Sequence, residues 1–147
     1  MVFLPRNFSE EQILDIVRQW VDVLAKQDYD LTFSELRYAV AFDTPGAECI
    51  KNEIERYRST NYFPGVEEFK VTDWRTAVGG NPLPLQKVIW YKPNDSKLVG
   101  AIVFDLPLNG KWSDLTADFV FTEVGNPEGY ALCLEQIDSP RQRDGEL

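Results

Sequence analysis

The hydrophobic pattern of this chain changes its period once, near residue 61, and this change limits the fold classes open to it. Before that point, apolar residues recur every three or four positions, which is the spacing of one face of an α-helix. After it, apolar and polar residues alternate, as they do in half-buried β-strands. Helices gathered at the front and strands gathered behind them predict an α+β fold with an antiparallel sheet.

The first helix carries the most complete set of signals. Ser9 and Gln12 form a capping box, and Phe8 and Ile13 stand at the positions of a hydrophobic staple. The helical spacing then continues to about Lys26, so one broad face is predicted to pack on a core. The apolar residues of this face are Ile13, Ile16, Val17, Trp20, Val21 and Leu24.

Two further helix starts follow in the next thirty residues. Thr32 and Glu35 form a second capping box, which predicts a short helix over 33–42. Thr44 then stands as the cap of a third helix over 45–58, which begins at a proline. The apolar stripe of this third helix consists of Ile50, Ile54 and Tyr57.

Alternating segments separated by turn residues predict the strands of the sheet. The turn sequences at 93–96 and 125–129 suit hairpin connections, and Asn109-Gly110 suits another, so the last strands form an antiparallel meander. The predicted strands lie at roughly 67–74, 85–92, 97–105, 115–124 and 129–138. We expect one domain over 1–138, followed by a polar, disordered tail over 139–147.

Both faces of the central predicted strands are apolar. In the 97–105 strand, Ile102 and Phe104 lie on one side, while Val99 and Val103 lie on the other. Such a sheet needs cover on each side, either from the helices and a second subunit or from strong curling of the sheet itself. We therefore predict a homodimer through the outer sheet face.

Charge and composition exclude several classes of function. The formal net charge is −9, so the average surface repels nucleic acid and anionic membranes, and neither is expected as a partner. The absence of histidine excludes histidine-based triads and metal sites, and we expect neither a cofactor nor a metal. Cys49 and Cys133 are interpreted as free thiols of a reducing compartment, and a cytoplasmic location is expected.

Two stretches resemble known proteins. The segment from Trp20 to Asp30 resembles the end of the first helix in the cone-shaped superfamily of ketosteroid isomerase, scytalone dehydratase and nuclear transport factor 2. That resemblance implies a cystatin-like cone, in which N-terminal helices pack on a curved antiparallel sheet around a pocket. The segment from Phe104 to Ala117 is similar to a stretch of uncharacterised small bacterial proteins, which implies a shared fold and no known activity.

The resemblance places a candidate site inside the cone, between the first and third helices and the concave face of the sheet. Aromatic walls with a few polar groups are typical of small-ligand pockets. Asp105 and Asp118 each interrupt an apolar strand face, and burial would raise the pKa of either carboxyl. The candidate ligand-binding residues are Trp20, Tyr57, Trp74, Trp90, Asp105 and Asp118. No residue is assigned a catalytic role.

Three functions remain open from the sequence. The first is a cone-fold protein that binds a small apolar or amphipathic ligand. The second is an acidic protein-interaction module of the immunity type, in which the net charge of −9 attracts a basic partner. The third is an isomerase- or dehydratase-like enzyme that uses a pocket aspartate. A pocket would favour the first or third, and a filled interior with an exposed aromatic patch would favour the second.

Overall fold

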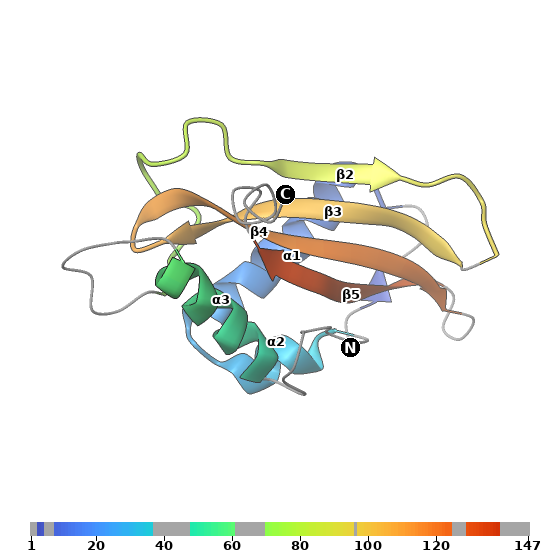
Figure 1. Ribbon diagram of the computed structural model, residues 1–147. Coiled ribbons are helices and arrows are strands. Elements are labelled where there is room, and N and C mark those ends of the chain that lie inside the picture. Colours follow the sequence, from blue (N-terminus) through green and yellow to red (C-terminus); the bar gives the residue numbers. More distant parts are fainter. Residues whose placement is uncertain are drawn as a thin grey trace.

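The computed structural model is an α+β fold in which N-terminal helices pack on a curved, unclosed antiparallel sheet, as the sequence predicted (Figure 1). The structure describes residues 3–4, 8–36, 48–60, 70–95, 97–124 and 129–138. The helices are α1 (Glu10–Ala25), α2 (Tyr29–Ser34) and α3 (Glu48–Thr60). The strands are β1 (Phe3–Leu4), β2 (Gln86–Trp90), β3 (Leu98–Leu108), β4 (Lys111–Val124) and β5 (Gly129–Asp138).

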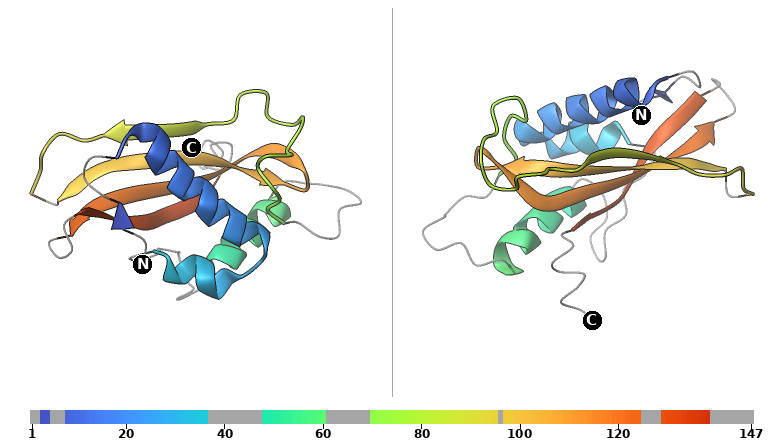
Figure 2. Two further views of the ribbon diagram at one scale, coloured as in Figure 1. Left: turned by 180° about the vertical axis from the view of Figure 1, so that it is seen from behind. Right: turned by 90° about the horizontal axis from the view of Figure 1, so that it is seen from above.

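The sheet has the strand order β1-β5-β4-β3-β2, and every neighbouring pair is antiparallel. Helices α1 and α2 lie on one face of this sheet (Figure 2). Helix α3 lies on the opposite side, where it contacts β5 and also reaches α2. The strand order makes β2 the outermost long strand of the sheet. The first turns of α1 lie beside it.

Helix α1 forms as its capping signals predicted. The Ser9 hydroxyl accepts a hydrogen bond from the backbone of Gln12, and the Gln12 side chain accepts one from the backbone of Ser9. Burial of each large apolar side chain on its inner face contributes about 1.5 to 3 kcal/mol. The buried face contains Ile13, Leu14, Val17, Trp20, Val21 and Leu24.

The second helix differs from its prediction. Helix α2 begins after Asp28, whose carboxylate accepts a hydrogen bond from the Leu31 backbone, so Asp28 is the cap. Thr32, the predicted cap, lies inside the helix and donates its hydroxyl proton to the Asp28 carbonyl oxygen. The predicted start at 33 is therefore wrong, and residues 37–42 lie outside the described residues. Thr44, the predicted cap of the third helix, also lies outside them.

Three of the predicted strands are confirmed as β2, β3 and β5, and β4 begins earlier than predicted. Strands β3 and β4 join through Asn109 and Gly110, whose φ angles of 51° and 82° give the two-residue turn that Asn-Gly favours. Strand β3 passes through Pro107 because the register shifts there, beyond the end of β2.

The predicted strand at 67–74 is wrong over 70–74, which makes only an isolated bridge between Val71 and Leu108. Residues 67–69 and the predicted tail at 139–147 lie outside the described residues. Cys133 is buried, and its Sγ lies 4.0 Å from the Thr122 hydroxyl and from the Ala131 carbonyl oxygen. The side chain of Cys49 lies outside the described residues.

Candidate functional site

Trp20 lies in the hydrophobic core between α1 and the sheet. Its indole packs edge to face on Phe119, with ring centroids 5.1 Å apart, and its Nε1 donates a 3.0 Å hydrogen bond to the Thr32 carbonyl oxygen. This partner satisfies the only polar atom of the indole. Other large, fully buried side chains belong to the same hydrophobic core, so the described interior is packed: Phe104, Phe119, Phe121, Ile102, Leu106, Leu115 and Leu132.

Asp105 is buried, with 3% of its surface exposed, and its carboxylate accepts three hydrogen bonds. The Thr116 hydroxyl donates to Oδ1 at 2.6 Å, while the Leu85 backbone and the Asn81 amide donate to Oδ2 at 2.7 and 3.0 Å. These donors stabilise the charged carboxylate in a buried position. Asp105 therefore fastens the loop 81–85 to the sheet.

Tyr57 and Asp118 each form a hydrogen bond with a polar side chain of a neighbouring element. The Tyr57 hydroxyl, on α3, donates a 2.5 Å hydrogen bond to the Asp114 carboxylate on β4. Asp118 is half-buried on β4 and accepts a 2.6 Å hydrogen bond from the Gln136 amide on β5. Both contacts join neighbouring elements of the fold.

Trp74 and Trp90 both lie beside α1, Trp74 near Arg18 and Trp90 near Glu10. The guanidinium groups of Arg75 and Arg18 lie 4.5 and 5.4 Å from the Trp74 ring, within the range of cation–π attraction. Trp90, at the end of β2, donates a 2.8 Å hydrogen bond to Glu10 and packs edge to face on Phe121. The six predicted residues are therefore spread over several elements and line neither of the two pockets described next.

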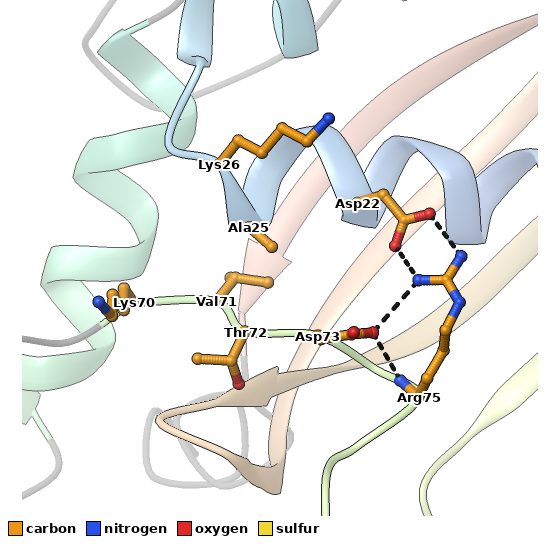
Figure 3. Close-up of a pocket in the computed structure, with 8 residues that line it drawn as sticks. All are labelled: Asp22, Ala25, Lys26, Lys70, Val71, Thr72, Asp73 and Arg75. Atoms are coloured by element: carbon orange, nitrogen blue, oxygen red, sulfur yellow. Dashed lines mark hydrogen bonds and ion pairs between the residues drawn. The ribbon is translucent and has the colours of Figure 1, made fainter.

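An open groove of about 540 Å³ lies between the last turn of α1 and the segment 70–75 (Figure 3). The Arg75 guanidinium donates to both oxygens of Asp22 at 2.7 and 2.8 Å and also contacts Asp73. Lys70 lies at the end of the groove away from this ion pair (Figure 3). The groove is therefore polar, with most of its fixed charges already matched. A second pocket of about 190 Å³ is lined by Tyr91, Pro93, Asn94, Lys97, Leu98, Val99, Glu123 and Tyr130.

The most unusual surface of the described residues is the stretch 78–91, which we call the edge segment. It comprises the loop before β2, β2 itself and the residue that follows. Among the described residues, six of the seven exposed large hydrophobic side chains belong to it, and Leu31 on α2 is the seventh. Exposed apolar side chains gathered along one sheet edge are a candidate interaction surface. The six are Val78, Leu83, Leu85, Ile89, Trp90 and Tyr91.

The loop of the edge segment is held firmly although its apolar side chains face solvent. The Val78 and Asn81 backbones donate to the carbonyl oxygens of Gly110 and Trp112 at 3.0 and 2.9 Å, and Asp105 holds the end of the loop. Even so, Val78 and Leu83 are 73% and 83% exposed. The loop therefore presents these side chains in a fixed geometry, which lowers the entropy cost of binding.

The α1 side of β2 is acidic. Glu10 contacts Trp90, and Arg18 donates to Glu11, to Asp15 and to the Gln86 side chain on β2. Two carboxylates, those of Glu11 and Asp15, thus share one guanidinium beside this strand, and their side chains remain 69% and 57% exposed. Glu10 adds a third carboxylate, which accepts its hydrogen bond from Trp90. The edge segment is therefore apolar with an acidic flank.

Glu53 is a buried carboxyl that the sequence reading did not single out. It lies three positions after Ile50, on the apolar stripe of α3, which is the signal that could have revealed it. Its Oε2 accepts no hydrogen bond from the described residues, and Arg56 Nη1 stands 3.9 Å away. Burial raises the pKa of Glu53, Arg56 opposes this rise, and Asp138 adds to it.

Glu53→Gln is expected to stabilise the fold at neutral pH by about 1 kcal/mol, because the amide carries no charge that burial would desolvate. Because the folded-state pKa lies above the ordinary value of 4.5, the wild type loses stability as pH rises through that range. Below about pH 4 the carboxyl is protonated in both states, so the advantage of the variant should vanish. Urea unfolding at both pH values tests this, and an advantage independent of pH would contradict it.

No protein-family model, no curated protein and no solved structure matches this chain. Within the described ranges, no three or more Asp, Glu or Cys side chains group so that they could hold a metal ion. The same part of the chain contains no helix with the length and apolar character needed to cross a bilayer.

Proposed function

We propose that this protein is a protein-interaction module that binds a basic partner protein through the edge segment. The observation that carries the proposal is the concentration of exposed apolar side chains on residues 78–91. The acidic flank formed by Glu10, Glu11 and Asp15 supports a partner of opposite charge. A net charge of −9 would also steer such a partner towards this surface.

Binding of a small ligand is the second candidate function. The α+β arrangement is compatible with membership of the cone-shaped superfamily, and the groove beside Asp22 and Arg75 is the observation that favours a ligand. Its matched charges favour a polar ligand over the apolar one first expected. For an enzyme, Asp105 is poorly placed to reach a substrate, because its carboxylate is buried and already accepts three hydrogen bonds.

The homodimer through the outer sheet face and the cytoplasmic location stay predictions. Ile89 is exposed on β2, and its neighbours Val99 and Val103 on β3 are half-buried, so this part of the sheet has apolar surface to offer. Sedimentation of the purified protein over a range of concentrations measures whether two copies associate.

Photo-crosslinking tests the proposed function. A photoreactive amino acid at position 83, in the edge segment, is expected to form a discrete heterologous adduct in cells of the source organism. The same amino acid at position 31 is the matched control, because Leu31 is the exposed apolar side chain outside the segment. The captured protein, once purified, should bind Leu83→Ser about tenfold more weakly than wild type and bind Leu31→Ser normally. Equal adducts at both positions, or none, would contradict the proposal.

A further inference from the structure

We infer that the partner binds by adding an extended strand to the free edge of β2, with basic side chains on its α1 side and apolar side chains on the other. This inference rests on the proposed function and specifies its mode of binding. Strand addition supplies affinity through backbone hydrogen bonds and specificity through alternate side chains.

The hydrogen-bond register of β2 leaves alternate backbone groups free. Tyr91 N–H donates to the Val99 carbonyl oxygen, and Asp105 N–H donates to that of Leu85, so odd-numbered residues of this stretch bond to β3. Gln86, Val88 and Trp90 therefore direct their backbone N–H and C=O groups away from β3. No other described strand pairs with this edge.

This edge has little of the protection that usually keeps an edge strand unpaired. Residues 86–90 contain no proline, and their pairing with β3 runs without a register shift. Lys87 is the one charged side chain within the strand. The opposite edge of the sheet is formed by β1, which has only two residues, so β2 is the longer template.

The side chains beside the edge define the partner's chemistry. Because successive residues of a strand point to opposite faces, Gln86, Val88 and Trp90 share the α1 side with the carboxylates of Glu11 and Asp15. An added strand would place every second side chain next to these carboxylates, where lysine or arginine is favoured. Its remaining side chains would lie on the opposite face, beside the exposed Ile89, where apolar residues are favoured.

Charge argues against a second copy of this chain as the added strand. Antiparallel pairing of two β2 edges about a two-fold axis would bring the first turns of both α1 helices to the same face. The carboxylates of Glu11 and Asp15 from both copies would then lie close together, and like charges facing each other are unfavourable.

The test uses an alternating lysine–valine peptide as the probe and an N-methylated peptide of the same sequence as its matched control. N-methylation removes backbone donors and leaves the side chains unchanged. The unmethylated peptide should bind about tenfold or more tightly than the methylated one in calorimetry. At saturation it should slow amide exchange at residues 86, 88 and 90, whereas residues 87 and 89 should change little because β3 already protects them.

A double variant, Glu11→Gln with Asp15→Asn, tests the charge requirement. It should weaken binding of the lysine–valine probe about tenfold and leave a serine–valine probe unaffected. Equal affinity for the two lysine–valine peptides, or no slowing of exchange at residues 86, 88 and 90, would overturn strand addition. Slow exchange at those residues in the free protein that depends on concentration would also overturn it, in favour of a second copy. The adduct at position 83 would still decide the proposed function separately.

Discussion

Replacing Asp105 with alanine is expected to lower the free energy of unfolding by about 3 to 5 kcal/mol, because it removes the acceptor of three hydrogen bonds at once. The Leu85 backbone and the Asn81 amide would lose this acceptor, and the Thr116 hydroxyl would keep only its longer contact with the Asp114 carbonyl oxygen, at 3.3 Å. Asp105→Asn should cost less, because the amide oxygen still accepts one of these hydrogen bonds. The midpoint of urea unfolding at neutral pH measures the difference.

Asp95→Ala is the control for this prediction, since Asp95 is exposed in the β2–β3 connection and should change stability by less than about 0.5 kcal/mol. A loss for Asp105→Ala as small as that of the control would show that the carboxylate does not hold the loop. Asp105 would then regain its standing as a candidate for proton transfer. The loop is part of the edge segment, so Asp105→Ala should also weaken partner binding through Leu83.

Replacing Gly100 with alanine is expected to destabilise the fold by about 3 kcal/mol or more, at the upper end of overpacking costs. A methyl group at this position would stand 2.4 Å from the Ile89 carbonyl oxygen and 2.6 Å from the Phe121 ring. The ring packs over the glycine from the α1 side, and the carbonyl belongs to the neighbouring strand. Relief therefore requires β2 to move away from β3, and thermal unfolding followed by circular dichroism measures the cost.

Gly110→Ala separates this steric effect from backbone strain. Gly110 has a φ of 82°, but no atom lies within 4 Å of a methyl group placed there. Its replacement should therefore lower the free energy of unfolding by only about 1 to 2 kcal/mol, the cost of an alanine in the left-handed backbone conformation. If the two variants were equally destabilised, the close packing of Phe121 on Gly100 would not be the cause. Gly100→Ala should also disturb the β2 edge, and with it the inferred strand addition.

Local signals in the sequence predicted those elements whose stabilising contacts are close in the chain. The capping box of Ser9 and Gln12 set the start of α1 because both partners lie within one turn. Asn109-Gly110 set the β3–β4 turn because both positions need a positive φ. The same reasoning failed at Thr32, where two caps competed and Asp28 began the helix four residues earlier.

The candidate surface could be predicted only in part. The apolar residues Val78, Leu83 and Leu85 in the loop before β2 were a signal in the sequence, but the alternating pattern of the strands does not include them. Trp90 was predicted to line an interior pocket, but it lies on the outermost long strand. A strand pattern gives the faces of a strand and not its place in the sheet.

The sequence by itself determined the fold class, the start of α1, three strands and the tight turn, because periodicity, capping and turn conformation act over a few residues. The tertiary structure alone decided that β2 forms an edge and that the Asp105 carboxylate accepts hydrogen bonds that hold the loop before β2. It also decided that Trp20 fills the core where a pocket was expected. Strand order, burial and hydrogen-bond partners depend on contacts between residues far apart in the chain, such as Asn81 with Asp105 and Trp90 with Glu10. Those long-range contacts turn an alternating apolar strand into an exposed, acid-flanked edge.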